Sequence, residues 1–151
     1  MKKILKSSSA FITLLVMLFS ASVSAYAVNC ASSVDKICKV FSLMADRTSQ
    51  IQTIEELDNI NFDKAILDSG IDQISDECVN YQLTQFDKEK IMLAFDKFVD
   101  ATIDKTYSLC DGILTRDYLK GELDPLRETM RKAVYKSTTL NDLIENINSA
   151  F

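Results

Sequence analysis

The sequence contains no histidine, and among its 151 residues there are three glycines and one proline. The absence of histidine excludes the Ser-His-Asp triad, the Cys-His pair and every zinc or haem site that depends on imidazole ligands. The scarcity of glycine disfavours phosphate-binding loops and folds built from tight strand turns. Catalysis would have to rest on carboxylates or lysines with shifted pKa values, and no motif marks one, so the sequence predicts no enzyme and no cofactor.

The first 27 residues have the layout of a secretory signal peptide. Three lysines precede an apolar run over residues 10–19, which is too short to span a bilayer with margin. Small residues then offer cleavage after Ala25 or Ala27. We therefore expect a cleaved signal peptide over residues 1–27 and one helical domain over residues 28–151. An uncleaved N-terminal anchor is the alternative.

The compartment and the charge of the mature chain follow from this cleavage. The short, lysine-rich start and the absence of an Asn-x-Ser/Thr sequon favour a bacterial protein, periplasmic or secreted, with no stable membrane anchor after cleavage. Cleavage after Ala27 would leave 14 basic and 22 acidic side chains, a net charge of −8. Such a charge disfavours nucleic acid and anionic membranes as partners, so any charged partner is expected to be a basic protein.

All four cysteines, Cys30, Cys38, Cys78 and Cys110, follow the predicted cleavage site. An even number in a small exported chain predicts two disulfides, with free buried thiols as the alternative. If residues 71–82 and 85–110 formed a simple antiparallel hairpin, Cys78 and Cys110 would lie roughly 30 Å apart, beyond the reach of a disulfide. Either that hairpin is wrong, or these two cysteines pair with Cys30 and Cys38, in an order that the sequence leaves open.

Apolar residues recur at helical spacing along the mature chain, and strict alternation never holds for six residues. The longest periodic stretch covers residues 85–110, where apolar side chains keep one broad face for more than five turns. The sequence therefore predicts an all-α fold, a single small bundle of roughly five to seven helices around a long central helix.

Helix boundaries are marked by capping residues. Capping boxes are predicted at Ser32-x-x-Asp35, Thr84-x-x-Asp87 and Thr139-x-x-Asp142, and Gly70 is expected to end a short helix with a positive φ. A short turn is expected to stop at Gly121. Asp124-Pro125 then predicts the start of a separate helix, with an acid at the N-cap and proline at the first helical position.

Two series of aspartates spaced four residues apart are the main candidate site. Such like-charge pairs destabilise a helix by a few tenths of a kcal/mol, a cost that binding to a partner could offset. We expect them to form docking strips for another protein; a metal site and a solvated face balanced by Lys97 and Lys105 are the alternatives, and no calcium-binding loop is present. The candidate residues are Asp96, Asp100, Asp104, Asp68, Asp72 and Asp76.

Charge is also segregated along the chain. Residues 55–104 hold 13 acids and 4 bases, whereas residues 116–136 hold 4 acids and 6 bases. The two segments could pair within the molecule, or the acidic one could stay open and steer a cationic protein toward it.

The function that the sequence favours is that of an exported binding or inhibitory protein which docks on a basic protein, such as a cell-wall hydrolase or a toxin. A stress chaperone triggered by acid is a variant of this prediction. The alternatives are an enzyme that uses carboxylates and a carrier of an apolar ligand between the helices. The aromatic residues that could line such a pocket, or simply fill the core, are Phe41, Phe62, Phe86, Phe95, Phe98, Tyr107 and Tyr118.

Overall fold

The computed structural model describes residues 30–74 and 76–150, so the predicted signal peptide and its cleavage sites lie outside the described residues. Over the described ranges the chain forms six α-helices and two 3-10 turns, with no strand beyond an isolated bridge between Gln82 and Thr139. The all-α fold and the long central helix are thus confirmed. The elements are α2 (Ala31–Gln50), α3 (Ile54–Asp58), α4 (Asp63–Ser69), η1 (Ile71–Gln73), η2 (Asp76–Cys78), α5 (Gln85–Leu109), α6 (Arg116–Lys136) and α7 (Leu140–Ala150).

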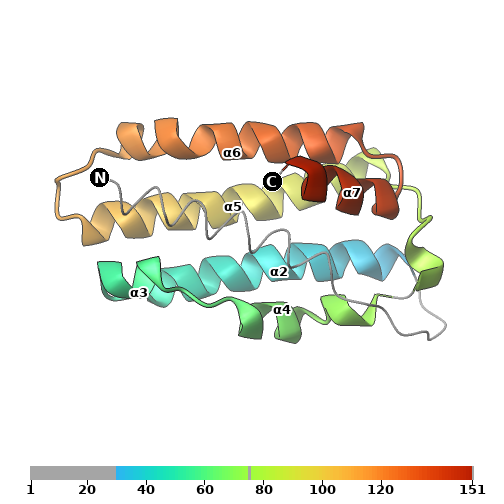
Figure 1. The fold of residues 1–151 in the computed structure, drawn as a ribbon, viewed down its shortest axis with the longest axis horizontal. Helices are drawn as coiled ribbons and strands as arrows, with labels where there is room; N and C mark the ends of the chain where they lie inside the picture. Colours follow the sequence, from blue (N-terminus) through green and yellow to red (C-terminus); the bar gives the residue numbers. More distant parts are fainter. Residues whose placement is uncertain (1–29, 75, 151) are drawn as a thin grey trace.

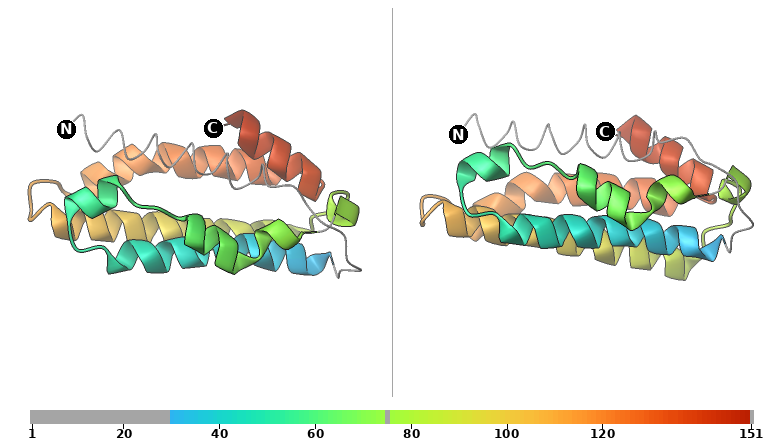
Figure 2. Two further views of the ribbon diagram at one scale, coloured as in Figure 1. Left: turned by 60° about the horizontal axis from the view of Figure 1, so that its bottom comes forward. Right: turned by 90° about the horizontal axis from the view of Figure 1, so that it is seen from below.

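Helix α5 lies between the two other long helices, α2 and α6 (Figure 1). Helices α2 and α5 run in the same direction, because Asp35 pairs with Lys90 and, further along, the Phe41 ring meets the Phe95 ring with centroids 5.3 Å apart. Helix α6 returns antiparallel to α5, since its first residue, Arg116, pairs with Asp104 near the end of α5. The chain from α3 to η2 makes the return between the parallel helices and lies along α2 (Figures 1 and 2). It also reaches α5, through α3 and through Phe62, whose ring packs on Phe98.

The centre of the bundle is a cluster of phenylalanines. Phe41, Phe62, Phe95 and Phe98 are each at most 1% exposed, and the pairs Phe41–Phe95 and Phe62–Phe98 meet edge to face. Of the seven aromatic residues considered for a pocket, these four belong to the core. The other three, Phe86, Tyr107 and Tyr118, lie on the surface instead.

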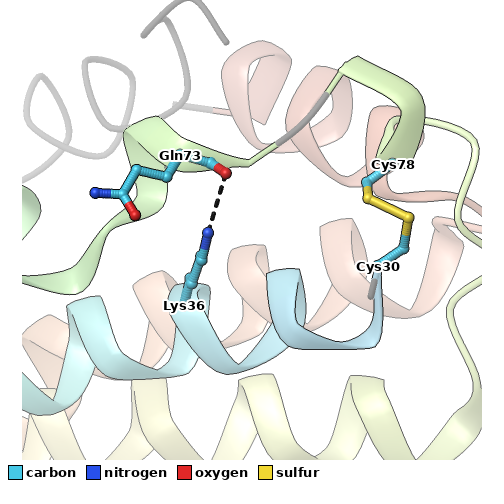
Figure 3. Close-up of a disulfide and its surroundings, with 4 residues drawn as sticks. All are labelled: Cys30, Lys36, Gln73 and Cys78. Carbon is cyan, nitrogen blue, oxygen red and sulfur yellow. Dashed lines mark hydrogen bonds between the residues drawn. A yellow bond between two sulfur atoms is a disulfide. The ribbon is translucent and has the colours of Figure 1, made fainter. Parts of the chain in front are cut away.

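One disulfide fastens the return segment to α2. Cys30, just before α2, is bonded to Cys78 of η2, with Cα atoms 5.1 Å apart (Figure 3). Further along α2, Lys36 Nζ donates to the Gln73 carbonyl oxygen at 3.0 Å, as Figure 3 shows. Lys39 Nζ donates to the Asp68 carbonyl oxygen at 2.6 Å. Both lysines thus hold the backbone of the segment.

The prediction of two disulfides is wrong, because Cys38 and Cys110 remain thiols. The parallel course of α2 and α5 places Cys38 close to Lys90, near the start of α5, whereas Cys110 follows its last residue. At 1.5 Å per residue the two cysteines are roughly 25–30 Å apart. Of the two alternatives that the sequence left open, the simple hairpin of residues 71–82 with residues 85–110 does not form, since Ile71–Gln73 and Asp76–Cys78 are separate 3-10 turns. Cys78 pairs with Cys30, and Cys110 has no disulfide. Burial raises the pKa of the Cys38 thiol to about 11, so it stays protonated and weakly reactive at neutral pH.

Two of the three predicted capping boxes are confirmed. Thr84 and Asp87 cap α5 reciprocally, and Thr139 and Asp142 do the same for α7. The expected stop at Gly70 is also confirmed, with φ at +71°. The box at Ser32-x-x-Asp35 is wrong. Helix α2 starts at Ala31, directly after the disulfide-bonded Cys30, so these two residues already lie within its first turns.

The separate helix predicted at Asp124-Pro125 is wrong, because α6 runs unbroken through Gly121 and Pro125. Thr115 caps the whole helix by accepting a hydrogen bond from the Tyr118 backbone N–H at 3.1 Å. Buried apolar residues lie on both sides of the proline, with Leu119 2% and Met130 0% exposed. Packing on both sides of the proline therefore outweighs its local cost to the helix.

The cap of α7 makes the stability of the fold depend on pH. Hydrogen bonds from the Thr138 hydroxyl and from the Thr139 and Thr138 backbone N–H groups lower the pKa of Asp142 from 3.8 to about 2. A carboxylate with a lowered pKa stabilises the fold above its unfolded-state pKa, and this contribution disappears as the pH falls from about 4 to 2. Urea unfolding at pH 6 and pH 2.5 should show a smaller acid loss for Asp142→Asn than for the wild type. Glu122→Gln, at an exposed position, is the matched control; equal losses in all three proteins would contradict the assignment.

Candidate protein-binding surface

The aspartates of α5 are engaged by arginines of α6. Arg127 Nη2 lies 2.5 Å from the Asp100 carboxylate, and Nη1 lies 3.6 Å from Asp96, an ion pair too long for a hydrogen bond. Arg116 Nη1 lies 2.5 Å from Asp104. Of the six aspartates expected to dock a partner, the three on α5 are therefore paired within the chain. The alternative that the acidic and basic segments pair inside the molecule is confirmed for α5 and α6.

Arg127 is the centre of this arrangement, and its replacement should lower the free energy of unfolding. Its side chain is 19% exposed and also reaches Asp124 at 3.7 Å. Arg127→Gln would leave the 28%-exposed Asp96 without its countercharge. We expect a loss of about 1–2 kcal/mol in the free energy of unfolding, measured in urea, because the site is only partly screened by water. Arg131→Gln, which breaks an exposed pair with Glu128 on α6, should cost less than about 0.5 kcal/mol. Equal costs would refute a special role for Arg127.

The second series, Asp68, Asp72 and Asp76, does not form one strip. The left-handed Gly70 ends α4, so these aspartates lie on α4, η1 and η2 respectively. Asp68 pairs with Lys64 at 2.7 Å, and Asp76 is exposed. All three belong to the same return segment. Elements α4 and η1 lie along α2 on the side opposite α6, whereas η2 lies at the end of the bundle, where the chain that follows it bonds to the start of α7 (Figure 1).

Residues 54–78, which we call the acidic layer, carry eight acids and one base, a net charge of −7. The two lysines of α2 that reach this layer donate to backbone carbonyl oxygens of Asp68 and Gln73. Helix α6, across the bundle, has a net charge of +2. The charge is therefore unevenly distributed: the acidic layer is strongly negative, whereas α6 carries a small positive charge. The acids of the layer are Glu55, Glu56, Asp58, Asp63, Asp68, Asp72, Asp76 and Glu77.

An open groove lies at one end of the acidic layer, where α2, α3 and the start of the following loop meet. It has a volume of about 750 Å³. Glu55 and Glu56 line it together with Arg47 and with amide side chains such as Asn59. A groove lined by two carboxylates can bind a basic side chain through charge-assisted hydrogen bonds.

Sequence reasoning missed a group of exposed apolar residues around the turn between α5 and α6. Ile113 is 84% exposed there, and Tyr107 and Tyr118 lie on the two flanking helices. One signal was present in the sequence: Ile113 follows Gly112, beyond the end of the periodic stretch over residues 85–110, and so belongs to no helical face.

Comparison with known proteins gives no match, whether to family models, to curated proteins or to solved structures. Across residues 30–74 and 76–150, no group of three or more Cys, Asp or Glu residues is placed to hold a metal ion. None of the helices in that part of the chain is long and apolar enough to cross a membrane.

Proposed function

We propose that this chain is an exported binding protein, of the inhibitor or immunity type, that docks on a basic protein through its acidic layer. The observation that carries the proposal is the net charge of −7 on residues 54–78, set on the outside of the bundle. A surface of one sign attracts a partner of the opposite sign over roughly one Debye length, which speeds association. Export is supported by the signal-like first 27 residues and by the Cys30–Cys78 bond, which an oxidising compartment would preserve.

The way in which the layer is held supports the same proposal. Lys36 and Lys39 fix its backbone through the Gln73 and Asp68 carbonyl oxygens, and the disulfide fixes its end. The carboxylates are thus presented on a segment that is already ordered before binding. Such preorganisation lowers the entropy lost on association.

Neutralising the layer tests the proposal. The variant with a neutralised layer (the bait variant) is Glu55→Gln/Asp68→Asn/Asp76→Asn. The matched control is Glu122→Gln/Glu128→Gln/Glu145→Gln, which removes the same charge from α6 and α7. Both proteins and the wild type are used to capture exported proteins from the source organism at low salt and at 0.5 M salt. We expect the wild type and the control to retain the same basic protein at low salt, and the bait variant to lose about tenfold or more of it.

Two outcomes would contradict the proposal. The first is a partner that both triple variants retain equally. The second is binding that is unaffected by 0.5 M salt, because contacts between exposed charges weaken when the Debye length shrinks to a few ångströms.

A further inference from the structure

Three exposed apolar side chains lie on the turn between α5 and α6 and on the helix ends beside it. We call these residues, Tyr107, Ile113 and Tyr118, the docking tip. They are 37%, 84% and 43% exposed. The adjacent Leu114 packs against the core, so the chain buries one apolar residue of this turn and leaves its neighbour outside. The exposed apolar residues Leu67, Phe86 and Leu93 lie elsewhere, on α4 and on the first half of α5.

The tip is held in a defined conformation. Asp111 and Gly112 both adopt the left-handed region, with φ at +46° and +79°, and the Ile113 backbone N–H donates to the Cys110 carbonyl oxygen at 3.0 Å. A left-handed aspartate is uncommon and is retained where the surroundings determine the turn. Ile113 is therefore displayed on an ordered turn, and its immobilisation on binding would cost little conformational entropy.

An arginine fixes the aromatic part of the tip. The Arg116 guanidinium lies over the Tyr107 ring, 4.8 Å from its centroid, and its Nη1 bonds Asp104 at 2.5 Å. A stacked and ion-paired arginine keeps the tyrosine ring in place. Tyrosine and arginine are also the residues most enriched among those that dominate binding energy at protein interfaces.

We propose that the docking tip inserts into an apolar pocket of the same basic partner, so that binding is anchored at this end of the bundle. The inference rests on the proposed function. Figures 1 and 2 place the α5–α6 turn at the same end as α3, away from the disulfide, and α3 contacts α5. This end of the bundle is acidic on balance, because α3 and residues 104–120 together carry six acids and three bases. The exposed acids among them include Glu55, Glu56 and Asp111. This charge pattern fits a pocket whose rim is basic, with the apolar anchor at the centre and ion pairs around it.

Site-specific photo-crosslinking in the source cells tests this geometry on the full chain. The photo-reactive residue p-benzoylphenylalanine replaces Ile113 in one variant and Phe86 in the control, where an exposed apolar residue lies at the first turn of α5 near the disulfide end. We expect position 113 to give one adduct with a basic protein at a yield about tenfold above that of position 86. Ile113→Ser should reduce capture of the same protein by about tenfold without changing the urea unfolding curve, because the side chain is exposed.

The outcomes separate the two proposals. Equal adducts at positions 113 and 86, no adduct at either position, or an adduct made of two copies of this chain would overturn the docking tip. If position 113 gives its adduct, neutralisation of the acidic layer should abolish it. An adduct that survives neutralisation would leave the tip in place and refute the electrostatic part of the proposed function.

Discussion

Cys30→Ala/Cys78→Ala should lower the free energy of unfolding by about 4 kcal/mol. The bond closes a loop with a sequence separation of 48 residues, and in the chain-entropy model a loop of that length gives about this stabilisation. The loss should be largest for the acidic layer, because η1, η2 and α4 are short elements that depend on their attachment to α2. Urea denaturation followed by circular dichroism measures the total, and amide hydrogen exchange in residues 54–78 reports the local loosening.

Reduction of the wild type provides the internal control. It should reproduce the destabilisation of the double variant, whereas Cys38→Ala should cost no more than about 1 kcal/mol because that side chain is half-buried and lies outside the bond. A double variant as stable as the wild type, or exchange that stays unchanged in residues 54–78, would show that the bond does not hold the layer.

Phe95→Ala should cost about 3–5 kcal/mol, the usual range for removing a buried phenyl ring. Phe95 is 0% exposed, meets Phe41 edge to face at 5.3 Å and lies 6.4 Å from the Phe98 ring. The contact with Phe41 joins α2 to α5, so the cavity left by the alanine would weaken the packing of this helix pair. Phe86→Ala, at an exposed position, should change the stability by less than about 0.5 kcal/mol.

The same variant addresses the apolar-carrier alternative. If the rings serve as packing, Phe95→Ala lowers stability and mass spectrometry of the native wild type shows the bare chain. A cost below about 1 kcal/mol, together with an apolar molecule that leaves the wild type on extraction, would instead favour the carrier.

Much of the fold follows from local signals that the sequence contains. Helix α5 combines a capping box at Thr84 with an apolar face maintained over its whole length, and both signals act within a few residues. Helix α6 was predicted in two pieces because Gly121 and Pro125 are strong local breakers. Its continuity depends on contacts with α5 that have no local signature. The disulfide pairing depended in the same way on the parallel course of α2 and α5.

The candidate site was likewise predictable only in the part that depends on local sequence. Segregation of charge was visible in the sequence, but which acids remain available depends on the register of α6 against α5. That register brings Arg127 to Asp100 and Arg116 to Asp104, and it shifts the candidate surface from α5 to residues 54–78. The exposure of Ile113 likewise depends on the left-handed turn at Asp111 and Gly112.

The central claim is that an exported chain carries its acidic layer on α2 through one disulfide. Its most direct test is the intact mass of the protein taken from cells, denatured and treated with iodoacetamide without reduction. The account predicts a chain that begins at residue 26 or 28 and carries two alkyl groups, one on Cys38 and one on Cys110. A chain that keeps its first residues and carries four alkyl groups would contradict it.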